Sequence, residues 1–202
     1  MLANTCFSED LLKWEYVGVL FEGAEYAHCI ECPDFFKLGE DYVLMFSKIG
    51  ETERSTIFAV GDFENGRLVN YTISRPEWGP DYYAPQTFED PLKRRLMMGW
   101  MYHWGKEAPE GCDVAGALSI ARELTVKDRQ VFSYPPEELR HLLTRESRYV
   151  QADGNLLRIP DGNGRITERM LPGMNCVEIL EDTKALEVFI NKGEYVFSQW
   201  LF

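Results

Sequence analysis

A glutamate beside a cysteine–proline pair is the first feature of the sequence that could carry chemistry. Glu31 is followed by Cys32, Pro33 and Asp34, and two phenylalanines come next. Pro33 fixes its own φ and favours an extended conformation for Cys32. A carboxyl group in a partly apolar cleft keeps its proton to higher pH, so Glu31 on such a strand could act as a general acid. The alternative, which composition alone favours, is a surface strand end that carries two acidic residues.

A second cluster places a carboxylate beside aromatic rings and an amide. Asp81 precedes Tyr82 and Tyr83, and Gln86 follows shortly after. Aromatic faces stack on sugar rings, whereas carboxylates and amides bind sugar hydroxyls. The pattern therefore fits a saccharide site, but it fits a β-turn followed by core tyrosines at least as well.

Two shorter patterns carry less chemical meaning. Gly99 beside Trp100 could let a ligand approach the backbone closely, although a buried strand with a bend explains the pair more simply. Cys29 and Cys32 form a lone C-x-x-C motif, but a zinc site needs two more ligands at matching spacing. The sequence also contains no Gly-rich phosphate loop, no G-x-S-x-G elbow and no H-E-x-x-H motif. We therefore expect neither a metal ion nor another cofactor.

The charge balance limits the classes of partner. The 202 residues include 21 Lys and Arg against 33 Asp and Glu, which gives a net charge of −12. Such an acidic chain is poorly suited to bind nucleic acid or an anionic membrane surface. No apolar run approaches the roughly 18 residues of a membrane span, and the first residues do not resemble a signal peptide. With five cysteines, an odd number, the composition predicts a cytoplasmic protein with reduced thiols.

The elements that must position these residues are almost all strands. Short runs of β-branched and aromatic residues recur about every 8–12 residues, which is typical of a sandwich, barrel or propeller. Asn65-Gly66 lies between two such runs and predicts a hairpin turn. A helix is predicted only over 135–143, where prolines come first and acidic residues fill the first turn. The predicted strands are residues 16–21, 41–47, 56–61, 67–73, 94–102, 176–180, 185–190 and 195–202.

Taken in order along the chain, these motifs resemble those of glycoside hydrolase family 32, the β-fructosidases. The family includes invertases, sucrose-6-phosphate hydrolases, inulinases and levanases. The segment Ser8-Glu9-Asp10-Leu11-Leu12-Lys13-Trp14-Glu15 looks like the family's S-x-D-L-x-x-W-E, and Glu31-Cys32-Pro33-Asp34 is its E-C-P-D motif. Residues 81–86 with Gly99-Trp100-Met101 look like D-x-Y-A-P-Q to G-W-M. Arg122-Glu123-Leu124 looks like P-R-E-L, and residues 187–194 look like the E-x-F-x-N-x-G-E hairpin.

The resemblance implies a five-bladed β-propeller followed by a β-sandwich. Residues 1–134 would be the later part of the propeller, and residues 135–202 a linker helix with a shortened sandwich. We expect its middle strands, between residues 148 and 175, to be missing. By the same resemblance Glu31 is the general acid/base. The fructosyl subsite would be lined by Asp81, Tyr82 and Trp100, with Cys32 adjacent to the acid.

The family reaction is a retaining hydrolysis, in which a second carboxylate attacks the anomeric carbon. The family's nucleophile motif, N-D-P-N-G, and its R-D-P motif are both absent from this sequence. The only Asp-Pro is Asp90-Pro91, after the D-Y-Y-A-P-Q motif. We therefore expect an N-terminally truncated chain that is inactive alone, and that self-associates or depends on a complementary N-terminal fragment.

Two alternatives remain for the function, and the substrate stays open. The chain could be a non-catalytic fructoside-binding or interaction remnant, or the product of a damaged or wrongly bounded gene. Sucrose, sucrose 6-phosphate and fructans all fit the family as the fructose-containing saccharide. By charge alone, the candidates for binding a substrate phosphate are Lys93, Arg94, Arg95 and Lys106.

Overall fold

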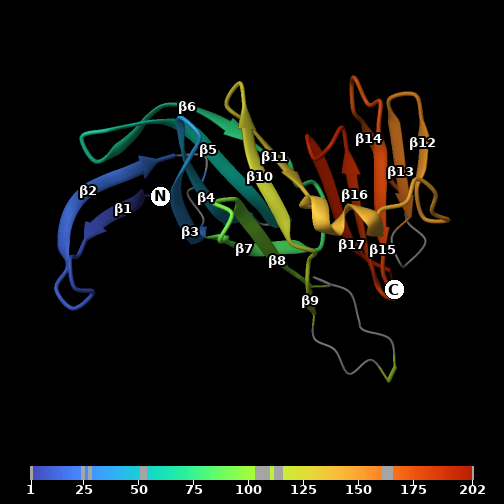
Figure 1. The fold of residues 1–202 in the computed structure, drawn as a ribbon, viewed down its shortest axis with the longest axis horizontal. Coiled ribbons are helices and arrows are strands. Elements are labelled where there is room, and N and C mark those ends of the chain that lie inside the picture. The colour runs from blue at the N-terminus through green and yellow to red at the C-terminus, as the bar shows by residue number, and fades with distance from the viewer. Residues whose placement is uncertain are drawn as a thin grey trace.

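The computed structural model describes residues 2–23, 26, 29–50, 54–102, 110–111, 116–160 and 166–201, without the side chains of Leu2 and Cys29. Nearly all regular elements in these ranges are β-strands, which confirms the all-β class. The described strands form five antiparallel sheets, and Figure 1 shows them following one another along the long axis of the molecule.

The first large sheet consists, in spatial order, of β3 (Cys29–Leu38), β4 (Asp41–Ile49), β5 (Arg54–Glu64) and β6 (Arg67–Ser74). Its strand β4 is buried on both faces. Val43 and Met45 point into one core cluster, whereas Leu44 and Phe46 point into another. Because successive side chains of a strand point to opposite faces, a strand between two cores needs an uninterrupted apolar run.

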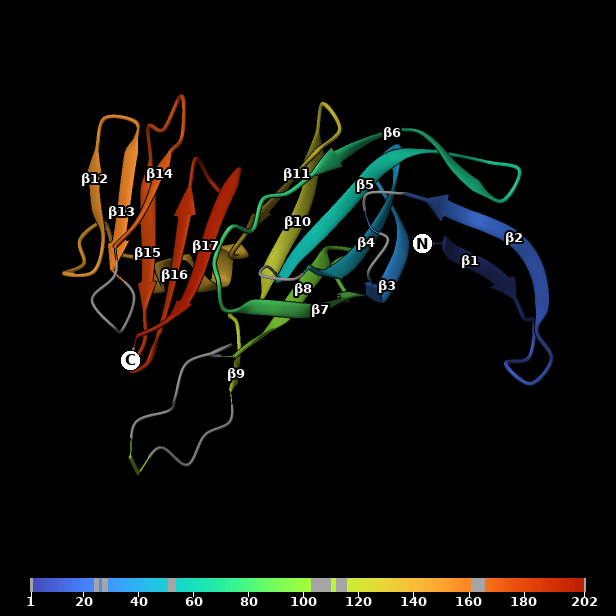
Figure 2. The same ribbon diagram turned by 180° about the vertical axis from the view of Figure 1, so that it is seen from behind.

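The second large sheet consists of β7 (Tyr82–Glu89), β8 (Arg95–Met101), β9 (Ala117–Leu118), β10 (Arg122–Lys127) and β11 (Gln130–Tyr134). Its order is β11-β10-β8-β7, with β9 paired to β8. Strand β7 contacts β3, β4 and β5, so the two large sheets meet at β7, which Figure 2 shows from behind with one end next to β3. Their shared core contains Tyr82, Met97 and Leu124 together with Val43 and Phe58.

A two-stranded hairpin packs on the other side of the first sheet. It is formed by β1 (Leu2–Phe7) and β2 (Glu15–Glu22), and β1 pairs only with β2 among the described strands. Its turn is ordered by the carboxylate of Asp10, which accepts hydrogen bonds from the backbone N–H of Lys13 and Leu12; these bonds lower the pKa of Asp10. The exposed large apolar residues of the hairpin are Phe7, Leu11, Leu12, Trp14, Tyr16 and Val17.

Two three-stranded sheets form the C-terminal part. They are β12 (Gln151–Asp153), β13 (Leu156–Pro160) and β14 (Ile166–Met170), and β15 (Val177–Glu181), β16 (Ala185–Ile190) and β17 (Tyr195–Trp200). Leu157 and Ile159 of the first pack against Val188 and Phe197 of the second, which makes a small sandwich. The expectation that strands are missing between residues 148 and 175 is therefore wrong. Strands β12 and β14 are mostly exposed, so they lack the apolar alternation by which a sequence reveals a strand.

The segment that joins the two parts is helical, as predicted, but shorter and tighter than an α-helix. It is a 3-10 helix, η2 (Glu137–Leu142), which buries none of its residues. A short helix without a buried face gains no packing energy that would extend it. In the part of the chain that the structure describes, no helical segment reaches the length and apolar content that crossing a membrane requires.

Candidate active site

Glu31 lies at a β-bulge in β3. Glu31 pairs with Ser47 and Asp34 pairs with Met45, so β3 holds one residue more than β4 over this stretch. Cys32 takes a left-handed φ of 49°, rather than the extended conformation expected before Pro33. The bulge overrides the preference that proline imposes on its neighbour. Bulges of this kind re-aim side chains, and they are frequent beside active sites.

A second bulge lies in β7. Tyr83 pairs with Trp100 and Gln86 pairs with Met98, so β7 also holds one extra residue. Ala84, inside this bulge, has a φ of 47°. Because Tyr83 and Trp100 are direct cross-strand partners, their side chains lie on the same face of the sheet.

The two bulges are joined by the two carboxylates of the E-C-P-D segment. The Tyr83 hydroxyl donates to Oε2 of Glu31 at 2.7 Å. Oδ2 of Asp34 accepts from the backbone N–H of Thr87 at 3.0 Å and from its hydroxyl at 2.6 Å. One carboxylate on each side of Cys32 thus ties β3 to β7, and the half-buried Glu31 is held toward Tyr83.

Trp100 adds a partly exposed aromatic surface beside this pair. Its side chain is 37% exposed, and its ring centroid lies 4.9 Å from that of Tyr102. Gly116 approaches the indole so closely that a Cβ there would lie 2.4 Å from Nε1 of Trp100. The Glu31 carboxyl, which can donate or accept a proton, therefore lies beside the aromatic side chains of Tyr83 and Trp100. This combination can bind a sugar ring and exchange a proton with its glycosidic oxygen.

The structure does not bring Asp81 and Tyr82 to this surface. Tyr82 is 1% exposed, its ring lies 4.5 Å from the Arg122 guanidinium, and burial raises its pKa. Asp81 is also 1% exposed, and its Oδ2 accepts a hydrogen bond from the backbone N–H of Trp200 in β17 at 2.8 Å. Both residues therefore face the interior of this structure, whereas the sequence predicted that they line the fructosyl subsite. Cys32, in contrast, is an exposed free thiol beside Glu31.

Tyr83 is the site residue that sequence reasoning missed. Tyr82 and Tyr83 are adjacent, so a strand must point one inward and the other toward Glu31. The period of the strand could have shown that only one of them reaches the site. It could not have shown which one, because the choice depends on contacts with residues far away in the sequence, such as Arg122, whose guanidinium lies over the Tyr82 ring.

Two of the four basic candidates for phosphate binding, Lys93 and Arg94, are paired with acidic residues. Lys93 pairs with Glu89 at 2.8 Å, and Arg94 pairs with Asp90 at 2.8 Å and with Glu138 at 2.9 Å. These contacts lie at the β7–β8 turn, the end of the hairpin away from Tyr83. The remaining candidates are Arg95, whose guanidinium lies over the Phe36 ring at 4.7 Å, and Lys106, which is outside the described residues.

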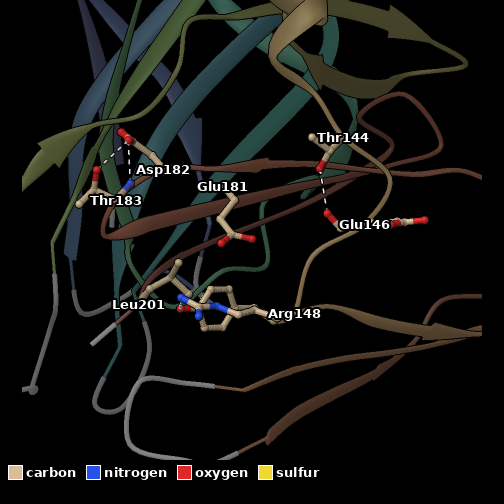
Figure 3. Close-up of a pocket in the computed structure, with 8 residues that line it drawn as sticks. Thr144, Glu146, Arg148, Glu181, Asp182, Thr183 and Leu201 are labelled. Carbon is tan, nitrogen blue, oxygen red and sulfur yellow. Dashed lines mark hydrogen bonds between the residues drawn. The ribbon is translucent and has the colours of Figure 1, made fainter.

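A separate pocket of about 560 Å³ lies in the C-terminal part (Figure 3). It is lined by the segment after η2, the β15–β16 turn and Leu201, and none of these elements belongs to β3, β7 or β8. At its rim, Asp182 accepts hydrogen bonds from the backbone N–H and the hydroxyl of the adjacent Thr183. The pocket is polar and open, and it does not include Glu31.

Comparisons with known proteins show the family and the fold of the chain. Residues 4–135 match the model of the "Glycosyl hydrolases family 32 N-terminal domain". A sucrose-6-phosphate hydrolase of Vibrio alginolyticus is 32% identical over 160 residues, which cover 72% of this chain and 33% of that protein. A sucrose-6-phosphate hydrolase of Escherichia coli is 32% identical over a gapped alignment of 259 positions, which covers 96% of this chain and 54% of that protein. The chain thus spans a third to about half the length of these relatives.

Solved structures share the fold. A family 32 β-fructofuranosidase of Bombyx mori superposes with a TM-score of 0.81 at 21% identity, over 98% of this chain and 55% of that one. A sucrose-6-phosphate hydrolase of Lactobacillus gasseri superposes with a TM-score of 0.77 at 18% identity, over 100% of this chain and 56% of that one. These likenesses support the later part of a β-propeller followed by a β-sandwich, and with the family match they lead to one conclusion. The chain belongs to glycoside hydrolase family 32.

Proposed function

We propose that this chain carries the acid/base part of a β-fructosidase site, with Glu31 as the general acid/base. The observation that carries the proposal is the 2.7 Å hydrogen bond from Tyr83 to Glu31 beside the exposed indole of Trp100. Tyr83 occupies Oε2 and fixes the carboxyl plane, which leaves Oε1 to protonate the glycosidic oxygen of a bound fructoside. After the leaving group departs, the same oxygen takes a proton from the attacking water.

The proposed subsite residues follow from their placement. Trp100 stacks on the fructosyl ring, Tyr83 orients the acid, and Cys32 lines the site next to Glu31. Asp81 acts on the site indirectly. By accepting a hydrogen bond from the backbone N–H of Trp200, it holds β17 against the segment that leads into β7. We assign it to positioning rather than to substrate contact.

We propose that the nucleophile comes from residues outside these 202. Retaining hydrolysis requires two carboxyl groups about 5–5.5 Å apart across the glycosidic bond. The family's nucleophile motif does not occur in the sequence, and Asp34, the carboxylate nearest to Glu31 along β3, is already bonded twice to Thr87. We therefore propose that the 202 residues alone do not turn over a fructoside.

The substrate class is a terminal β-fructoside. The relatives reported above include sucrose-6-phosphate hydrolases, and a mutant of the Bombyx mori enzyme has been solved in complex with sucrose. Because Lys93 and Arg94 are neutralised by acidic neighbours, they do not favour sucrose 6-phosphate over sucrose.

We also propose a boundary between two domains at Tyr134. Residues 1–134 form the propeller part, and residues 135–202 form the linker helix and the sandwich. The family match ends at residue 135, and the strands before and after this point lie in different sheets.

The hairpin offers a place for a partner. Strand β1 has no second neighbour among the described strands, and the hairpin exposes Phe7, Trp14 and Tyr16. An unpaired edge beside exposed apolar residues promotes pairing with another chain. We propose that the purified chain self-associates through this hairpin or binds a complementary N-terminal fragment there.

The test is hydrolysis of sucrose and sucrose 6-phosphate by the purified chain, combined with titration of fructose by calorimetry. We expect no turnover, together with fructose binding that a Trp100→Ala variant abolishes. Turnover that disappears in a Glu31→Gln variant would confirm the acid but overturn the statement that the nucleophile lies elsewhere. Absence of fructose binding would overturn the proposed site.

A non-catalytic fructoside-binding protein is the second candidate function. The missing nucleophile motif favours it for the isolated chain. Restoration of turnover by adding the N-terminal half of a family 32 enzyme would exclude it.

A further inference from the structure

A buried ion cluster joins the C-terminal sheet to the second large sheet. Arg122 of β10 is fully buried and donates to Glu77 at 2.7 Å and to Glu187 of β16. Ser198 of β17 accepts from Arg122 at 2.6 Å and donates its hydroxyl to Glu77 at 2.8 Å. Glu77 and Glu187 are each less than 5% exposed.

Burying this cluster between the two sheets carries a large desolvation cost. It places two carboxylates and one guanidinium out of contact with water. Burial raises the pKa of Glu187, although Arg122 opposes that rise. Apolar side chains of similar volume often join buried surfaces as well or better. The contacts of the cluster with the candidate site indicate another role.

One route from the cluster leads through Tyr82. The Arg122 guanidinium lies over the Tyr82 ring, and Gly99 lies so close to that ring that a Cβ there would be 2.2 Å from Cζ of Tyr82. Tyr82 directly precedes Tyr83, and Gly99 directly precedes Trp100. The position of the buried ring therefore fixes the backbone beneath both site residues.

A second route leads through the strand connection before β10. Oε1 of Glu187 accepts from the backbone N–H of Ile120 at 2.7 Å. The neighbouring Ser119 accepts from Gly99 N–H through its hydroxyl at 3.1 Å, and its own N–H donates to Gly99 O at 2.9 Å. Glu187 thus holds residues 119–120 against the backbone that precedes Trp100.

We propose that Glu187, a residue of the C-terminal sheet, is a positioning residue for the saccharide site. Through Arg122 and Tyr82, it fixes the position of Tyr83. Through Ile120 and Ser119, it fixes the position of Trp100. The identity of the ligand rests on the proposed function, but the coupling between Glu187 and Trp100 does not.

The coupling is tested by ¹⁹F NMR of the full chain labelled with 5-fluorotryptophan. The chain has five tryptophans, so the Trp100 resonance is assigned with a Trp100→Phe variant, and Trp14 in the distant hairpin serves as the internal reference. We expect Glu187→Gln, which replaces one accepting oxygen by a donor, to move the Trp100 resonance but not that of Trp14.

Two further variants make the result decisive. Ser119→Ala removes the acceptor of the Gly99 N–H and leaves the ion cluster intact, so it should move the Trp100 resonance even if Glu187→Gln does not fold. Glu178→Gln is the matched control, because Glu178 also ties the C-terminal sheet to the second large sheet, through Tyr134 at 2.7 Å. An unchanged Trp100 resonance in Ser119→Ala and Glu187→Gln, or an equal change in Glu178→Gln, would overturn the proposal.

Fructose titration of the same samples separates this proposal from the proposed function. We expect fructose to move the Trp100 resonance of the unsubstituted chain, and to bind more weakly to Glu187→Gln than to Glu178→Gln. If fructose has no effect on the unsubstituted chain, the proposed function fails. The coupling would still be decided by the ligand-free spectra.

Discussion

Tyr83 and Glu31 are 52 positions apart in the sequence, yet the tyrosine hydroxyl lies 2.7 Å from the glutamate carboxylate. Each residue lies at a bulge, one in β3 and the other in β7. At each bulge one residue, Cys32 in β3 and Ala84 in β7, takes a left-handed φ that a regular strand does not contain. The Glu31 carboxyl is therefore held in place by a contact between two bulged segments, not by the regular part of either sheet.

The first prediction concerns this hydrogen bond. Tyr83→Phe removes the donor to the part-buried Glu31 carboxyl, and leaving such an acceptor without its hydrogen bond costs about 1–3 kcal/mol. We expect a loss of stability within that range, measured by urea unfolding. Tyr195→Phe, in the C-terminal sheet, is the control and should change stability less. Equal effects of the two substitutions would show that the bond to Glu31 is not a specific contact.

The second prediction concerns Arg122. Arg122→Met leaves two buried carboxylates without their cation, so we expect the free energy of unfolding to fall by about 3–5 kcal/mol. Arg158→Met breaks a surface pair with Glu168, in which both side chains are at least one third exposed. Exposed pairs contribute about 0–1 kcal/mol, so this control should remain close to the unsubstituted chain. A small effect of Arg122→Met would mean that the carboxylates become neutral at little cost.

The third prediction follows from the raised pKa of Glu187, whose ordinary value is 4.5. The folded chain keeps a proton on this carboxyl to higher pH than the unfolded chain does, because burial disfavours the charged form. The unfolded state therefore loses its proton first, and stability contributed by Glu187 falls as pH rises above 4.5.

A Glu187→Gln variant lacks this titration. The difference in unfolding free energy, unsubstituted chain minus variant, should therefore become smaller as pH rises from 4.5 toward neutrality. Denaturant titrations at several pH values measure it. A difference that is constant, or that grows with pH, would contradict the prediction.

The fourth prediction concerns Gly99. A Cβ at this position would lie 2.2 Å from Cζ of Tyr82, and the buried ring has no room to move. We therefore expect Gly99→Ala to lower the free energy of unfolding by at least the ~1–3 kcal/mol that is typical of overpacking. Gly173→Ala serves as the control, since it carries only the strain of a left-handed φ, with open space around the Cβ. Thermal melts of the two variants compare the two costs.

Much of the fold could be predicted from the sequence, for physical reasons that are visible at particular residues. Val43 to Phe46 form an apolar run because β4 lies between two cores, and Asn65-Gly66 makes a hairpin turn because it tolerates positive φ. The strands β12 and β14 escaped prediction because almost no residue in them is buried.

The candidate site could be predicted only in part. The motif around Glu31 is local and was recognisable as a sequence. The inward orientation of the Asp81 and Tyr82 side chains was not recognisable, because it results from contacts with Trp200 and Arg122, which are far away in the sequence. Strand alternation allows either Tyr82 or Tyr83 to face the acid, and the distant contacts decide between them.

The last prediction concerns association through the hairpin. If the free edge of β1 pairs with another chain, the mass measured by light scattering should exceed that of the 23.4 kDa monomer and rise with protein concentration. Replacing Phe7 and Tyr16 by lysine places charges on the exposed face, and edge lysines oppose strand pairing. We expect this double variant to be monomeric while it keeps its affinity for fructose, since neither residue belongs to the candidate site. Lysine substitution of Ile166 and Met170, exposed residues of β14, is the matched control and should leave the association unchanged. A monomeric unsubstituted chain with a cooperative melt would show instead that the two-stranded hairpin is stable without a partner.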